Sequence, residues 1–102
     1  MKTWSGGSSF DYSGTVETGT VILYGKNNKV RVSAQQYHKI RKHFLNYVVP
    51  VGTSRTDAPR DSLGWWLQAN VTRTAIASYV APILIHEGYA EQEGKHNIRI
   101  TK

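Results

Sequence analysis

The chain has 102 residues, of which 39% are apolar and 20% are charged, and it contains no cysteine. This length suits one compact domain and excludes a multi-domain enzyme. Without cysteine there is no disulfide, no cysteine-based zinc site and no thiol nucleophile, so we expect an intracellular, cytoplasmic protein. No apolar run is long enough to span a bilayer, and residues 1–14 lack the apolar region of a secretory signal. A soluble protein without a membrane partner is therefore expected.

Positive charge is concentrated in the middle of the chain. The formal net charge is +6. Residues 25–60 contain one acid, Asp57, whereas the acids and bases of residues 61–102 balance. The bases of this region are Lys26, Lys29, Arg31, Lys39, Arg41, Lys42, Arg55 and Arg60. Scattered lysines usually form a solvated face, but this clustering also predicts anchoring of phosphate groups by residues 25–60.

The first elements are predicted from composition and alternation. Residues 1–19 are rich in glycine, serine and threonine, which predicts a flexible arm outside a domain that spans residues 20–102. Two β-rich runs follow, at residues 20–24 and 29–32, around a turn of glycine, lysine and asparagine. These runs predict a β-hairpin.

A first helix is predicted over residues 34–47. Ser33 and Gln36 have the spacing of a capping box. The apolar residues that follow recur at helical intervals and form one inward stripe, Tyr37, Ile40, Phe44, Tyr47 and Val48. The opposite face carries Gln35, Lys39, Lys42 and Asn46, so the helix is expected to be amphipathic with a basic outer side.

The second half predicts a short strand, two helices and a hairpin. Residues 48–51 suit a short strand, with Pro50 at an edge or end, and a polar loop follows. A helix over 62–69 begins after Asp61 or Ser62. Thr72 is the predicted cap of a third helix over 73–87, which Pro82 should kink or split. Gly88 ends this helix, and residues 89–101 form a C-terminal hairpin.

This order of elements resembles the winged helix-turn-helix, a fold used mainly to bind DNA. The resemblance is carried by the segment WLQANVTRTAIASYVAPILIHEGYAEQEGKHNIRI, residues 66–100, and extends to residue 33 when the first helix is included. It includes a short apolar helix, the Asn-Val-Thr turn, a longer helix, and Glu-Gly-Tyr opening a two-stranded wing. It implies an α+β, winged-helix-like three-helix core with a C-terminal β-hairpin wing, preceded here by the N-terminal β-hairpin.

The resemblance also implies roles for individual residues. The helix after the turn would enter the major groove and present Arg73, Thr74, Ala77 and Ser78 to base edges. Lys95 and His96 on the wing would approach phosphate or the minor groove, and the Thr72 hydroxyl would lie at an anion-favouring helix start. However, Thr74, Ala77, Ser78, Ala81 and Ile85 form a small, nearly uncharged face. This face suits a buried or dimer-forming helix as well as groove reading.

The prediction is therefore a non-enzymatic protein that binds double-stranded DNA, as a transcription regulator does. Phosphates are anchored by the basic region, chiefly Lys39, Arg41, Lys42, Arg55 and Arg60, beside a helix-turn-helix at residues 62–87. The alternative is a protein-interaction or adaptor module, in one form a homodimer, that uses the small-residue helix face and Trp65. Trp65 is either packed by the N-terminal arm or exposed as an interface or stacking anchor. An enzyme, a cofactor and a metal site are not predicted, because no nucleophile, phosphate-binding or metal-ligand motif is present.

Overall fold

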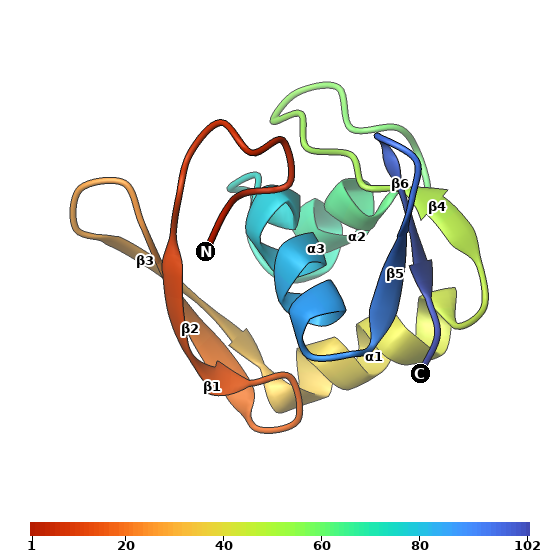
Figure 1. Cartoon of the computed structure of the whole chain (residues 1–102), viewed down its shortest axis with the longest axis horizontal. Coiled ribbons are helices and arrows are strands. Elements are labelled where there is room, and N and C mark those ends of the chain that lie inside the picture. The colour runs from red at the N-terminus through yellow and green to blue at the C-terminus, as the bar shows by residue number, and fades with distance from the viewer.

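The computed structural model describes residues 1–102 and has the predicted α+β class, with three helices and two three-stranded antiparallel sheets. The strand orders are β1-β2-β3 and β4-β6-β5. Figure 1 shows α3 in the middle of the molecule, with one sheet on either side and α1 beneath. The elements are β1 (Asp11–Thr15), β2 (Gly19–Tyr24), β3 (Asn28–Ser33), α1 (Ala34–Phe44), β4 (Val48–Pro50), α2 (Leu63–Asn70), α3 (Ala77–His86), β5 (Ala90–Glu93) and β6 (Asn97–Ile100).

The predicted hairpin is confirmed as β2 and β3, but it has a third strand. β1 pairs along the whole of its length with β2, from Asp11 opposite Leu23 to Thr15 opposite Gly19. The assignment of residues 1–19 to an arm outside the domain is therefore wrong. Phe10 and Val16 lie in the core, 4% and 1% exposed. β1 is not recognisable from the sequence, because its residues are mostly polar and most of them face solvent.

The start of α1 is confirmed and its end is not. The Ser33 side chain accepts a hydrogen bond from the Gln36 main chain, and the Gln36 side chain accepts one from the Ser33 main chain. The helix stops at Phe44 because Leu45 leaves the helical conformation, with a ψ of 126°. Asn46 follows with a positive φ of 67°, and the Tyr47 nitrogen closes this turn by donating to the Phe44 carbonyl at 2.9 Å. Tyr47 and Val48, predicted on the inward stripe, are consequently 65% and 51% exposed.

The predicted second helix is confirmed as α2, with Ser62 as its cap. The Ser62 hydroxyl accepts a hydrogen bond from the main-chain nitrogen of Trp65 at 3.1 Å. Gly64 lies against the main chain of Val51 and Gly52, and its nitrogen donates a hydrogen bond to the Val51 carbonyl. This close approach fixes the loop between β4 and α2 on the body of the domain.

The third helix begins four residues later than predicted. The nitrogen of Thr72 donates to the Leu67 carbonyl, so Thr72 belongs to the end of α2 and does not cap α3, which follows Ile76. Arg73 and Thr74 lie in the connecting turn, and α3 starts at Ala77. Pro82 lies inside α3 without splitting it, and Gly88, with a φ of 86°, follows its end as predicted.

The second sheet joins the short strand after α1 to the C-terminal hairpin. β4 pairs with β6, and β6 pairs with β5, as Val48 faces Arg99 and Arg99 faces Glu91. One continuous core of 20 buried residues connects both sheets and all three helices. No helix combines the length and the apolar character that crossing a membrane requires.

Candidate functional site

A shallow groove of about 520 Å³, open to solvent, lies between the outward face of α1 and the side of α2 that carries Trp66 and Asn70. α1 contains three lysines and arginines and two histidines but no acid. The groove is lined by Lys39, Lys42, His43, Trp66 and Asn70. No carboxylate lines it, so its potential is positive and suits a phosphate group.

The floor of the groove is aromatic. The His43 ring meets the Phe44 ring edge to face at 4.7 Å, and it lies 6.4 Å from the Trp66 ring at an interplanar angle of 35°. Trp66 is buried, whereas His43 is exposed. The Asn70 amide nitrogen donates to the Trp66 carbonyl at 2.8 Å, which fixes this side chain at the end of α2. The groove therefore combines two exposed lysines with an aromatic base.

Two predicted arginines emerge together beside the end of α2. The Gln68 amide nitrogen donates to the main-chain oxygens of Arg55 and Arg73, at 2.8 and 3.3 Å. One side chain thus joins the loop before α2 to the turn after it. Both arginines are exposed, and Gln68 shares the last turn of α2 with Asn70. Gln68 is two residues from both Trp66 and Asn70, so the two arginines lie on the side of α2 that faces away from the groove.

These cations are not neutralised within the molecule. Of the 13 lysines and arginines, only Arg99 forms ion pairs, with Glu91 at 2.6 Å and Glu93 at 3.4 Å. The hydrogen bond that Arg99 donates to the Glu91 carboxylate raises the pKa of Arg99, so this arginine stays charged. The Lys39 and Lys42 charges remain available to an external anion.

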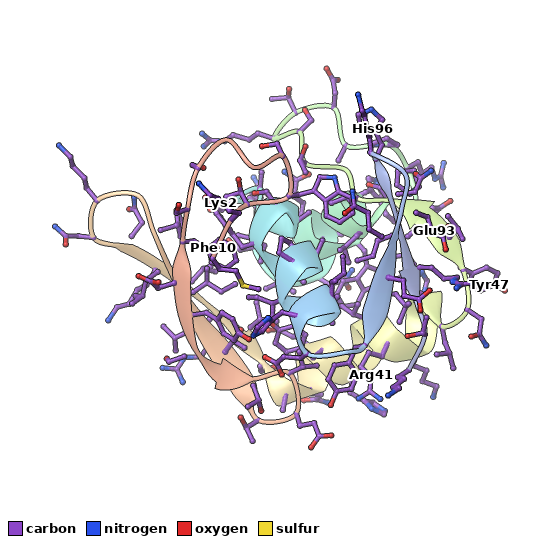
Figure 2. All side chains as sticks on the ribbon, viewed as in Figure 1. Lys2, Phe10, Arg41, Tyr47, Glu93 and His96 are labelled. Atoms are coloured by element: carbon purple, nitrogen blue, oxygen red, sulfur yellow. The ribbon has the colours of Figure 1, made fainter.

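Arg41, predicted to anchor phosphate with the basic region, does not line the groove. Its guanidinium lies 4.4 Å from the centre of the Tyr89 ring, and its Nε donates to the Lys102 carbonyl at 2.6 Å. It is half-buried on the flank of α1 that faces the end of α3. Figure 2 shows Arg41 and His96 at opposite ends of the β5–β6 hairpin. Arg41 therefore ties the C-terminal strand to α1.

Of the four residues predicted to read base edges, Ala77 is buried and Ser78 is half-buried on α3, whereas Arg73 and Thr74 are exposed in the turn before it. Ala77 and Ala81 are fully buried, and the Ser78 carbonyl accepts a hydrogen bond from the main chain of Trp4 at 2.9 Å. Only His86 is exposed along α3. Of the two readings of the small-residue face, the structure supports the buried helix. The cause is the N-terminal segment, whose contacts with α3 leave no signal in the local sequence.

The remaining predicted residues are dispersed. Lys95 and His96 are exposed in the β5–β6 turn, and Arg60 is exposed in the loop before α2. Thr72 is half-buried, and its hydroxyl accepts a weak bond from Thr74 at 3.4 Å. Trp65 is 38% exposed and outside the core. His43, Trp66, Asn70 and Gln68 complete the site and were not predicted as site residues. Their positions on the facing edges of two helices are the only sequence signal for them.

A second titratable cluster lies at the end of α3, away from the groove. Tyr12 donates to Glu87 at 2.6 Å, and the other Glu87 oxygen accepts from the Val16 nitrogen at 2.9 Å. Burial, followed by the hydrogen bond to Glu87, raises the pKa of Tyr12 to about 12. Glu17 likewise accepts a hydrogen bond from Tyr89, which raises the pKa of that phenol. Nowhere do three histidine, aspartate or glutamate side chains gather in a way that would hold a metal ion.

Comparison of the chain with protein-family models, curated proteins and solved structures gives no match.

Proposed function

We propose that the protein is a non-enzymatic, winged-helix-like DNA-binding domain that holds the phosphates of double-stranded DNA in the groove between α1 and α2. The observation that carries the proposal is the pair Lys39 and Lys42, which line a groove without any carboxylate. The succession of α1, β4, α2, α3 and the β5–β6 hairpin, with β4 paired to β6, supports the winged-helix part.

Binding of this kind rests on counterion release. Each lysine or arginine that neutralises a phosphate displaces condensed cations from DNA, so affinity falls as salt rises. Arg55 and Arg73, both exposed and held near α2 by Gln68, add further cations that could contact phosphates. Because α3 is covered, few base edges are within reach, and we expect weak discrimination between sequences. Arg73, exposed in the turn, is the one arginine placed to contact a guanine.

The test compares two double variants that remove the same charge. Lys39→Ala with Lys42→Ala empties the groove of its cations, whereas Lys26→Ala with Lys29→Ala removes two exposed lysines from the β2–β3 hairpin. We expect the groove variant to weaken binding of a short duplex about tenfold at low salt and to lower the slope of log Kd against log salt by about 2. The hairpin variant should weaken binding by less than about threefold. Equal weakening by both would show general attraction and overturn the groove assignment.

An exposed apolar strip favours a second candidate, a protein-interaction module that forms a homodimer. Leu45, Tyr47 and Val48 are 41%, 65% and 51% exposed where α1 passes into β4. β4 is an edge strand, but Pro50 removes one donor from its open side, so the side chains rather than the strand edge would form the contact. Sedimentation equilibrium tests this candidate: a mass that rises with concentration, and returns to the monomer in Tyr47→Asp, supports it.

A further inference from the structure

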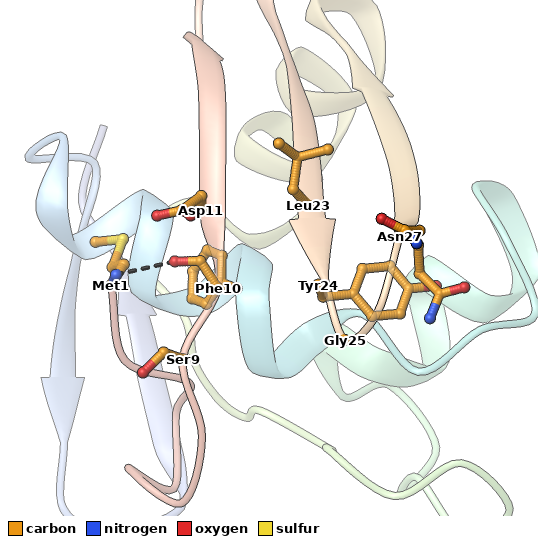
Figure 3. A pocket seen from close by; sticks show the side chains of 9 residues that line it. Met1, Ser9, Phe10, Asp11, Leu23, Tyr24, Gly25 and Asn27 are labelled. Carbon is orange, nitrogen blue, oxygen red and sulfur yellow. Dashed lines mark hydrogen bonds between the residues drawn. The ribbon is translucent and has the colours of Figure 1, made fainter.

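Residues 1–9 form a separate small unit, defined here as the flap. Lys2 and Ser9 make an isolated antiparallel bridge, and the Thr3 nitrogen donates to the Ser8 carbonyl at 3.0 Å. At the base of the flap, the Met1 amino group donates to the Phe10 carbonyl at 2.9 Å (Figure 3). Phe10 is fixed in the core against the Tyr79 ring, at 5.1 Å. The flap is thus a closed loop that leaves the body of the domain at Phe10.

Trp4 makes every hydrogen bond between the flap and the residues after Phe10. Its main-chain nitrogen donates to the Ser78 carbonyl at 2.9 Å, and its indole nitrogen donates to the Lys95 carbonyl at 2.8 Å. The first acceptor exists because of Pro82. In an uninterrupted helix the nitrogen of residue 82 would donate to Ser78, and proline has no such hydrogen. Pro82 therefore creates the acceptor to which Trp4 binds.

Through Trp4 the flap spans the shallow cleft between α3 and the β5–β6 turn. A depression of about 310 Å³, open to solvent, is lined by Met1, Lys2, Thr3, Trp4, Pro82, Ile85, His86 and Gln92. A second open depression, of about 260 Å³, is lined by Trp4, the loop before α2 and His96. Neither depression is lined by a carboxylate. Because residues 5–9 are exposed and only two hydrogen bonds join the flap to this face, we expect the flap to open more readily than the elements beside it.

We propose that the flap is an autoinhibitory lid, latched by Trp4, that shields the cleft between α3 and the β5–β6 turn from DNA. The proposal rests on the proposed function, since the ligand is the same duplex that the α1–α2 groove holds. Opening uncovers the half-buried Ser78 side of α3, which lies across Trp4 from the β5–β6 turn with its exposed Lys95 and His96. A closed lid lowers the apparent affinity by the fraction of molecules in which the cleft is open.

The experiment measures duplex binding and flap opening in Trp4→Ala and Pro82→Ala. Trp4→Ala removes the indole and its bond to Lys95. Pro82→Ala restores a nitrogen that competes with Trp4 for the Ser78 carbonyl while it improves the helix. We expect each variant to bind the duplex at least about threefold more tightly than the wild type, with faster hydrogen exchange at residues 3–9. Ser5→Ala, an exposed flap position, is the matched control and should change neither quantity.

The outcomes separate the two proposals. If the wild type binds DNA and loses affinity in Lys39→Ala with Lys42→Ala, but neither lid variant binds more tightly, the lid is overturned and the groove stands. If only the lid variants bind, the lid is supported, and adding Lys39→Ala with Lys42→Ala to Trp4→Ala then decides the groove: unchanged binding overturns it. If nothing binds, both are overturned. Should Trp4→Ala fail to fold, as judged by circular dichroism, Pro82→Ala alone decides.

Discussion

Gly64 in α2 lies directly against the main-chain oxygen of Gly52, with no space for a methyl group between them. Both partners are main chain, so no side chain can turn aside. We expect Gly64→Ala to lower the free energy of unfolding by about 2 kcal/mol, because the steric cost exceeds the gain in helix propensity. Urea unfolding measures the change. Gly7→Ala, which meets only a serine hydroxyl at 3.5 Å, is the control, and an equal effect there would contradict the packing argument.

A buried pair of hydroxyls joins the first sheet to α1. Tyr37 and Thr20 lie 2.7 Å apart through their side-chain oxygens, and both are at most 1% exposed. Burial raises the pKa of Tyr37. Tyr37→Phe leaves the Thr20 hydroxyl buried without this partner, so we expect a loss of about 1–2 kcal/mol in the free energy of unfolding. Tyr47→Phe, at a 65% exposed position, should change stability by less than about 0.5 kcal/mol.

Stability should fall at alkaline pH through Tyr12. Its pKa is raised from 10.0 to about 12 by burial and by the bond to Glu87, so folding favours the neutral phenol. The contribution is complete below pH 10.0 and is lost as the pH rises toward about 12. Because the pair is half-exposed, we expect about 1 kcal/mol from it. Unfolding of Tyr12→Phe at several pH values tests this: a wild-type advantage that persists unchanged beyond pH 12 would refute it.

Arg41 and Lys42 are neighbours with different expected effects. Arg41 is stacked on Tyr89 and bonded to Lys102, whereas Lys42 lines the groove. We expect Arg41→Ala to cost about 1 kcal/mol of stability and to leave duplex affinity within about twofold of the wild type. Lys42→Ala should reverse this, with unchanged stability and weaker DNA binding. Thermal unfolding and fluorescence anisotropy, measured on both variants, decide between the roles.

Elements with local signals could be predicted from the sequence. Ser33 and Gln36 indicate the start of α1, and Gly88 indicates the end of α3. Both signals can be read from the sequence because capping and a positive φ depend on residues that are neighbours in the chain. The end of α1 was missed because Tyr47 and Val48 continue its apolar period. The backbone turn at Leu45 and Asn46 ends the helix before Tyr47 and Val48.

Features that depend on distant residues could not be predicted. β1 is polar and is recognised only through its pairing with β2. Trp4 and Lys95 are 91 positions apart in the sequence, and the hydrogen bond between them helps to hold the N-terminal segment over α3. In the site, Lys39 and Lys42 follow from the polar face of α1. The arginine pair depends on Gln68, whose two acceptors lie on either side of α2 in the sequence.

The enclosure of α3 has a consequence for synthesis of the chain. Tyr79 packs against Phe10 and stacks on Tyr24, while the same core is completed by Ile98 and Ile100. Early and late segments must both be present before this helix is shielded from water. On the ribosome, this core can therefore be completed only after β6 has left the exit tunnel.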